Sequence, residues 1–197
     1  MTDLTADYSR YFWQGENIRL RPFRVEDAEQ RFIASLDSPT RQMHQDGIEL
    51  PTTLERERAW LETVEGCQDH GMVLFAIENP EGVMAGWISL HSRDDKNGTF
   101  SFGVAVYPDH RGHGYAVEAA QILLKYGFWE RRYQKCNSIC VHSNAASVRM
   151  HLKLGFVEEG RIRRNVFFNG VYHDHVMFGM TREEFDAKLE GDAASAL

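Results

Sequence analysis

The residues with the clearest capacity for chemistry form one short loop between an apolar run and a helical pattern. The loop begins at Arg111 and ends at Ala116, with glycines at positions 112 and 114. Because glycine has no Cβ, the N–H groups of Gly112 and Gly114 can approach a ligand closely. The helix expected after the loop adds unpaired N–H groups and the positive end of its dipole. The stretch therefore predicts a binding site for an anion, most naturally a phosphate or diphosphate.

Two well-known phosphate loops do not fit this stretch. A Walker A loop requires Lys-Ser/Thr after its last glycine, where this chain has Tyr115-Ala116. A dinucleotide fingerprint requires a third glycine at the position of Val117. A Gly-x-Gly pair is also common in ordinary turns, and a nucleotide phosphate binder of another kind stays open as an alternative.

A second set of polar side chains follows the next apolar strand pattern. Asn144 is a preferred N-cap residue, and Gly155 suits a left-handed C-terminal stop. A helix from Asn144 to Leu154 places Asn144, Ser147 and His151 on one face, at spacings of three and four. The same pattern also fits a capped amphipathic helix whose polar groups have no role in chemistry.

Two further histidines and two further acids have competing interpretations. His173 and His175 alternate along a predicted strand and share a face, yet no third ligand can be assigned, so we predict no metal site. Asp174 orients an amine or, as we favour, holds its hairpin. Glu118 lies in the first turn of its helix, where a dipole or capping role is favoured.

Composition limits the class of protein. The chain has 197 residues and a formal net charge of -7, from 22 basic and 29 acidic residues. This balance argues against a nucleic-acid binder, which presents a basic face, and is compatible with a cationic acceptor. The length predicts one domain over residues 1–197, with a short N-terminal arm and a frayed C-terminal tail from about residue 190.

The N-terminal residues and the cysteines predict where in the cell the protein is located. Met1–Leu4 lack the basic and apolar regions of a signal peptide, and no apolar run reaches membrane-spanning length. The chain has three cysteines, Cys67, Cys136 and Cys140. The last two share a predicted strand at roughly 13 Å, too far for a disulfide. We therefore expect reduced thiols in a cytoplasmic protein without a membrane partner.

The order of predicted elements indicates an α/β fold. Strands are expected at 18–23, 72–77, 83–90, 99–107, 138–142, 156–168 and 171–178, and helices at 25–36, 53–68, 117–131 and 144–154. The segment 38–51 is expected to be irregular, and Asn169-Gly170 predicts a hairpin turn. The prediction is a single mixed, mostly antiparallel central sheet with flanking helices.

The glycine loop closely resembles that of a known family. Its string resembles the R/Q-x-x-G-x-G/A loop of the GCN5-related N-acetyltransferase (GNAT) superfamily, and the order of elements is similar from Asn17 to Phe185. The resemblance implies the acyl-CoA N-acyltransferase (GNAT) fold, in which the fourth and fifth strands diverge around the cofactor arm. The residues that it assigns to acetyl-CoA are Val104, Ala105, Val106, Arg111, Gly112, His113, Gly114, Tyr115, Ala116, Asn144 and Ser147.

The second set of residues refines this resemblance. Asn144-x-x-Ser147 followed by Leu154-Gly155-Phe156 resembles the RimJ/RimL-like branch, which acetylates ribosomal-protein N-termini. The resemblance implies that Asn144 contacts pantetheine and that Ser147 lies near the cofactor sulfur.

This chain departs from the branch at two positions. Many relatives have a tyrosine acid where this chain has His151, so Ser147, His151 or water must assist the leaving thiolate. The glutamate that relatives often carry on the fourth strand is replaced by Ser101, which leaves the general base unassigned. The string from Phe167 to Asp174 resembles the closing hairpin of spermidine acetyltransferases.

The resemblance predicts an acetyl-CoA-dependent N-acetyltransferase that acts on a primary amine by direct attack in a ternary complex. The acceptor is a protein N-terminus or a small amine; a polyamine or an antibiotic is the alternative. A non-catalytic acetyl-CoA sensor is the alternative of another class. No metal and no nucleic acid are expected, homodimer formation stays open, and acceptor choice is attributed to residues 38–51 or the closing hairpin.

Overall fold

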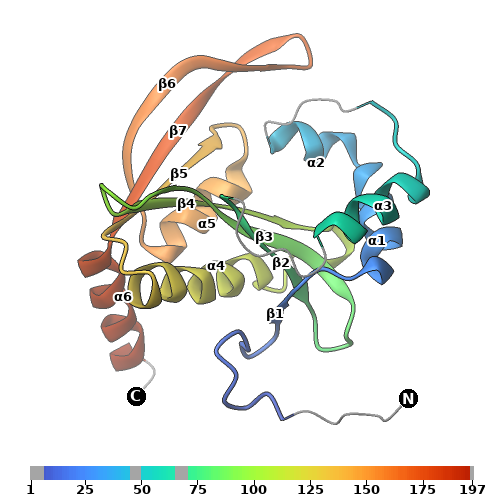
Figure 1. Ribbon diagram of the computed structural model, residues 1–197. Coiled ribbons are helices and arrows are strands. Elements are labelled where there is room, and N and C mark those ends of the chain that lie inside the picture. Colours follow the sequence, from blue (N-terminus) through green and yellow to red (C-terminus); the bar gives the residue numbers. More distant parts are fainter. Residues whose placement is uncertain (1–6, 45–49, 65–70, 196–197) are drawn as a thin grey trace.

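The computed structural model describes residues 7–44, 50–64 and 71–195 of the chain. Its centre is one seven-stranded sheet with the order β1-β2-β3-β4-β5-β7-β6 (Figure 1). The strands are β1 (Arg19–Arg21), β2 (Val73–Glu78), β3 (Met84–Asp94), β4 (Thr99–Val106), β5 (Lys135–Val141), β6 (Val157–Phe168) and β7 (Val171–Thr181). The helices are η1 (Val25–Asp27), α1 (Ala28–Ser35), α2 (Ser38–Met43), α3 (Leu54–Val64), η2 (Pro108–His110), α4 (Tyr115–Lys125), η3 (Tyr126–Glu130), α5 (Ala145–Leu154) and α6 (Arg182–Ser195).

The sheet is antiparallel except at its centre, where β4 and β5 run parallel. That parallel pairing covers only Thr99–Ser101 of β4 and Lys135–Asn137 of β5. Beyond Ser101, β4 continues to pair with β3, whereas β5 continues to pair with β7. The two central strands therefore separate, as expected, and leave an opening between residues 102–106 and 138–141.

Helices cover both faces of the sheet (Figure 1). On one face, residues of α4, α5 and α6, among them Leu123, Leu154 and Phe185, share the larger apolar core with Phe100 of β4. On the other face, α1 and α3 pack through a smaller core that contains Leu61. Because side chains alternate along a strand, each residue of β4 faces either the α4 side or the α1–α3 side.

The hairpin of β6 and β7 extends past the rest of the sheet toward α2 (Figure 1). Its turn is Asn169-Gly170, both with positive φ (51° and 75°), as the Asn-Gly pair predicted. At the turn, the side-chain amides of Asn169 and Gln42 exchange two hydrogen bonds, at 3.0 and 2.9 Å. The hairpin tip is therefore joined to α2 across one side of the sheet.

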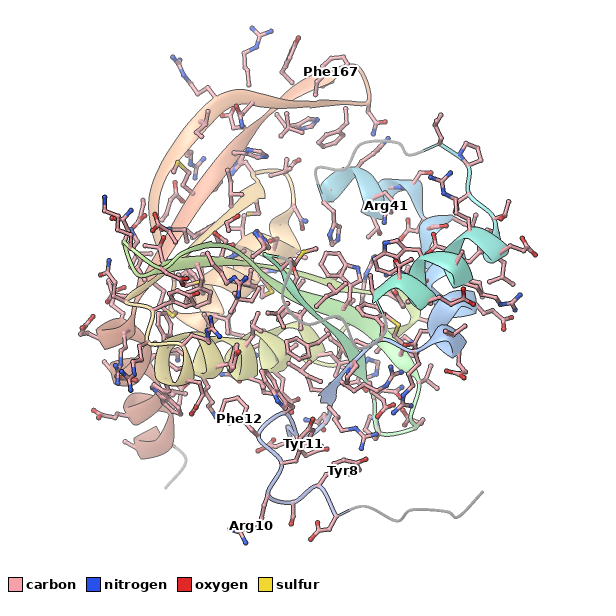
Figure 2. All side chains as sticks on the ribbon, viewed as in Figure 1. Tyr8, Arg10, Tyr11, Phe12, Arg41 and Phe167 are labelled. Atoms are coloured by element: carbon pink, nitrogen blue, oxygen red, sulfur yellow. The ribbon has the colours of Figure 1, made fainter. Side chains whose placement is uncertain are left out.

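The N-terminal arm packs on the body through aromatic side chains, and the Tyr8 ring lies under the guanidinium of Arg19 at 3.9 Å. The Trp13 ring centroid lies 4.6 Å from that of Phe75 and 5.0 Å from that of Tyr126. Tyr11 and Phe12 remain about two-fifths exposed on the surface of the arm (Figure 2).

Two helices differ from expectation. Residues 38–43 form α2 rather than irregular chain, because the side chain of Asp37 accepts a hydrogen bond from the Thr40 N–H and caps the helix. The expected frayed tail from residue 190 instead lies within α6 as far as Ser195. A capping box starts α6: the Thr181 N–H donates to Glu184 at 2.8 Å, and the Glu184 N–H donates to the Thr181 hydroxyl at 3.3 Å.

Some predictions cannot be compared with the structure. Cys67, the end of the helix predicted at 53–68 and residues 45–49 of the 38–51 segment lie outside the described residues. Within residues 7–44, 50–64 and 71–195, no helix has the length and apolar character needed to cross a bilayer.

Candidate active site

The glycine loop has the backbone that an anion site requires. Gly112 and Gly114 both adopt the left-handed conformation, with φ of 84° and 81°, and Gly114 is the N-cap of α4. A Cβ placed on either glycine meets no heavy atom of the described residues within 4 Å, so the space beside both is open in this part of the chain. The first N–H groups of α4, at Tyr115 and Ala116, have no partner inside the helix. The loop can therefore direct several N–H groups and a helix dipole at one anion.

The side chain of Arg111 does not extend into this open space. Its Nε donates to the Val106 carbonyl at 3.1 Å, and its Nη2 donates to the Thr40 hydroxyl at 2.6 Å. Its Nη2 also lies 3.5 Å from the Asp37 carboxylate at the start of α2. Arg111 thus connects the glycine loop to α2.

His113 remains within the loop. Its ring stacks on Tyr115 with a centroid distance of 5.3 Å, and its Nδ1 lies 3.2 Å from the His110 carbonyl oxygen. Glu118 serves another element: it accepts a hydrogen bond of 3.0 Å from the Asn17 N–H and so holds the N-terminal segment against α4.

The start of α5 lies at the other border of the opening. The Asn144 Oδ1 accepts a hydrogen bond from the Ser147 N–H at 3.1 Å, and Gly155 ends the helix with φ of 96°. Both caps agree with the sequence prediction. Since the cap uses only the oxygen of Asn144, the amide Nδ2 is left available to a ligand.

His151 lies in the core rather than on the surface of the opening. Only 2% of it is exposed, and its ring stacks on Phe178 at a centroid distance of 4.7 Å. The Nδ1–H donates to the Ser147 carbonyl at 2.8 Å, and Nε2 accepts from the Ser138 hydroxyl at 2.7 Å. Burial lowers the pKa of His151. Both ring nitrogens are therefore engaged, and neither is directed at a leaving group.

A histidine that the sequence analysis did not consider lies on the α1–α3 face. His91 of β3 is paired with Ser101 of β4. Its Nδ1 lies 2.9 Å from the Ser92 hydroxyl, and its ring donates to the Phe102 carbonyl. Burial lowers the pKa of His91, so the ring is neutral at pH 7, but both nitrogens have partners. No motif marked it, because only the pairing of β3 with β4 brings it there.

The closing hairpin carries the remaining polar residues. The Asp174 carboxylate accepts a hydrogen bond from the Arg164 N–H at 2.8 Å, which holds the hairpin as the sequence analysis favoured. His173 stacks on Phe168 at a centroid distance of 3.8 Å, and the His175 Nδ1 lies 2.9 Å from the Asn165 Nδ2. Among the described residues, no three His, Cys, Asp or Glu side chains are placed to hold a metal ion.

Cys136 and Cys140 are free and buried, and burial raises the pKa of both thiols. They are therefore protonated at neutral pH and are weak nucleophiles.

Comparison with known proteins identifies the family. A family model described as the acetyltransferase (GNAT) domain matches residues 17–157. The SPbeta prophage-derived uncharacterized N-acetyltransferase YokL of Bacillus subtilis (strain 168) is 37% identical over 175 residues, which cover 89% of this chain and 96% of the relative. The chain therefore belongs to the GNAT acetyltransferase family and is an N-acetyltransferase.

More distant relatives share the whole fold. Spermidine N(1)-acetyltransferase of Escherichia coli (strain K12) is 24% identical over 179 residues, covering 87% of this chain and 90% of that protein. The solved structure of spermidine N-acetyltransferase from Vibrio cholerae in complex with CoA and spermine gives a TM-score of 0.75 at 18% identity, covering 87% and 99% of the two chains. A GNAT-family acetyltransferase from Bacillus anthracis gives a TM-score of 0.73 at 25% identity, covering 86% and 98%. The α/β GNAT fold expected from the sequence is confirmed.

Proposed function

We propose that the chain transfers the acetyl group of acetyl-CoA to a primary amine, by direct attack within a ternary complex. The observation that carries this proposal is the open glycine loop at the N-terminus of α4, placed beside the separated edges of β4 and β5. A solved relative with the same fold is named as a CoA complex, which supports the choice of carrier.

In this proposal acetyl-CoA lies along the glycine loop and the opening between β4 and β5. The N–H groups of Gly112–Ala116 bind the diphosphate, and the free edge of β4 at Val104–Val106 pairs with the pantetheine arm. The Nδ2 of Asn144 donates to that arm while its oxygen caps α5. Arg111 acts as a positioning residue, because its side chain holds the loop against α2.

The reaction requires few catalytic groups beyond those that position the two substrates. The neutral amine attacks the thioester carbonyl carbon, a C–N bond forms, and the C–S bond breaks with its electron pair moving to sulfur. The amine proton leaves through water, and a β4 amide near Val104 stabilises the oxyanion. Ser147 donates a hydrogen bond to the departing thiolate, whose pKa near that of an ordinary thiol, about 8.5, requires little acid help. Holding the two substrates in register therefore supplies much of the rate.

Catalytic roles differ between the two residues predicted from the sequence. We keep Ser147 as the group nearest the sulfur. His151 acts as a positioning residue for Ser147, because its Nδ1–H donates a hydrogen bond to the Ser147 carbonyl. The His151 ring does not itself contact acetyl-CoA.

Two observations favour different acceptor amines. The Asn144 and Ser147 pattern supports the RimJ/RimL-like branch and therefore a protein N-terminus. The relatives named as spermidine acetyltransferases support a polyamine instead.

Release of free CoA thiol tests the proposal. The purified chain is incubated with acetyl-CoA and a panel of amines that includes an N-terminal peptide, spermidine and an aminoglycoside. Thiol release above the amine-free rate, with the acetylated amine detected by mass spectrometry, is the expected result. Binding of acetyl-CoA by calorimetry without release in any reaction would leave only a cofactor-binding module. A larger rise in melting temperature with ATP or NAD than with CoA would contradict the choice of carrier.

A further inference from the structure

Two histidines of the closing hairpin carry buried ring nitrogens without partners. The Nε2 atoms of His173 and His175 are both buried, and neither has a hydrogen-bond partner among the described residues. His175 as a whole is only 4% exposed. A buried polar atom left unpaired is unfavourable, so such an atom marks a place where a water molecule or a ligand can complete the bonding.

The ring of His175 is held in one orientation by a bulge in β6. His173 and His175 of β7 pair with Val166 and Ile162 of β6, so that three residues, 163–165, lie opposite Asp174 alone. This bulge directs Asn165 toward the ring, and the Asn165 Nδ2 lies 2.9 Å from the His175 Nδ1.

That contact sets the tautomer of His175. An amide nitrogen can only donate, so Nδ1 accepts and the ring proton lies on Nε2. Burial lowers the pKa of His175, so the ring is neutral at pH 7. The unpartnered atom is therefore an N–H donor.

His175 lies close to the opening between β4 and β5. His175 pairs with Val141, the last residue of β5, whose other edge borders the opening. Neighbouring strands lie about 5 Å apart, so His175 is about one strand width from that border. Val176 and Phe178 of β7 belong to the core on the α4 side, so His175, which alternates with them, lies on the α1–α3 side. The Gln42–Asn169 pair joins the hairpin tip to α2 on this same side.

On the basis of the proposed acetyltransferase function, we propose that the Nε2–H of His175 donates a hydrogen bond to an oxygen atom of the acceptor. The acceptor is then an amine that carries a carbonyl or hydroxyl oxygen within a few bonds of its amino group. A protonated polyamine has N–H donors and no oxygen, and it leaves the Nε2–H unpaired. The neighbouring Asp174 carboxylate accepts a hydrogen bond from the Arg164 N–H, and successive residues of a strand face opposite sides of the sheet, so it does not lie beside the His175 ring. His175 thus selects against unsubstituted polyamines, unlike the relatives named as spermidine acetyltransferases.

Matched amines test this selection directly. Ethanolamine and propylamine have nearly the same size and differ in one oxygen, and alaninamide and spermidine extend the comparison. Thiol release is measured at equal concentrations of unprotonated amine, because the amine pKa values differ. The expected kcat/KM is about tenfold higher for ethanolamine than for propylamine, which corresponds to one hydrogen bond of about 1.4 kcal/mol. A comparison of kcat/KM for alaninamide and for ethanolamine shows whether a carbonyl or a hydroxyl oxygen is the better hydrogen-bond acceptor for His175.

Variants of His175 test whether this residue causes the preference for ethanolamine over propylamine. His175→Phe is expected to bring the ratio close to one, whereas His175→Gln retains an N–H donor and is expected to restore part of it. Tyr172→Phe removes a hydroxyl from the opposite face of β7 and is expected to leave the ratio unchanged. Melting temperature and the CoA dissociation constant are measured for each variant. If His175→Phe does not fold, His175→Gln is the test, and a ratio that stays at the full wild-type value in that variant overturns the role of His175.

The outcomes separate the two proposals. Equal acetylation of propylamine, spermidine and the oxygen-bearing amines overturns the role of His175 and leaves the acetyltransferase function intact. A preference that survives in both His175 variants overturns it as well. An absence of thiol release with every amine, together with no binding of CoA, overturns the proposed function and this inference with it.

Discussion

Replacing Gly114 by alanine separates the loop's role in binding from its role in folding. Gly114 has φ of 81°, and a Cβ there meets no heavy atom of the described residues within 4 Å. Gly82, in the turn between β2 and β3, has φ of 78° and equally open space, so it is a matched control. The left-handed conformation is unfavourable for alanine by about 1–2 kcal/mol, so both variants should lose that much stability. For a chain of this length, 1 kcal/mol lowers the melting temperature by about 2–4 °C.

The two variants should differ in ligand binding. At Gly114, the N-cap of α4, the new methyl group occupies open space beside the loop, where the diphosphate is proposed to bind. Loss of about 1.4 kcal/mol or more of binding free energy raises the dissociation constant of CoA at least tenfold. Gly82→Ala should bind CoA as the wild type does.

Calorimetric titration with CoA and thermal unfolding are measured on the wild type and both variants. Equal dissociation constants for Gly114→Ala and Gly82→Ala would refute the reasoning, because the methyl group then obstructs nothing that the ligand needs. A larger loss of stability in Gly114→Ala than in Gly82→Ala would show that the methyl group at position 114 meets other atoms of the protein.

Three further predictions concern α5. Asn144→Asp keeps the cap oxygen and removes the amide donor, so the melting temperature should hold while calorimetry shows weaker CoA binding. Ser147→Ala should lower kcat in the thiol-release assay about fivefold or more, since a hydrogen bond contributes about 1 kcal/mol or more, and should change the CoA dissociation constant less, because that bond is proposed to form to the departing thiolate. His151→Phe leaves the buried Ser138 hydroxyl without its partner and removes the side-chain hydrogen bond to the Ser147 carbonyl, and should lower the free energy of unfolding by about 2 kcal/mol in urea denaturation. Because burial lowers the folded-state pKa of His151 from 6.5, the unfolded chain binds the proton first as the pH falls, and wild-type stability should decrease below about pH 6.5. His151→Phe should show a shallower decrease, and a loss of turnover at unchanged stability would instead restore a catalytic role.

The parts of the site that local signals define were predictable. Glycines at 112 and 114 required left-handed backbone before a helix, and both adopt it. Asn144 and Gly155 indicated the two ends of α5 because each residue type suits one cap. The divergence of β4 and β5 followed from the resemblance alone, and the sheet register confirms it.

The parts that depend on tertiary packing were not predictable. The helical spacing placed His151 beside Ser147 correctly, but only the sheet behind α5 shows that its ring is enclosed by Phe178 and bonded to Ser138. Arg111 resembled a cofactor ligand, and its bonds to α2 depend on a helix that was predicted as irregular chain. The His175 Nε2, which has no hydrogen-bond partner among the described residues, is oriented through a bulge in the neighbouring strand, and the bulge leaves no local signal.

The central claim is that the backbone amides of residues 112–116 bind the diphosphate of CoA. Following the amide resonances of the isotope-labelled chain during titration with CoA tests it most directly. The account predicts that the N–H resonances of Gly112, Gly114 and Ala116 shift most, with that of Gly82 unmoved. Largest shifts at another surface, such as the aromatic arm around Trp13, with those of the loop unchanged, would contradict it.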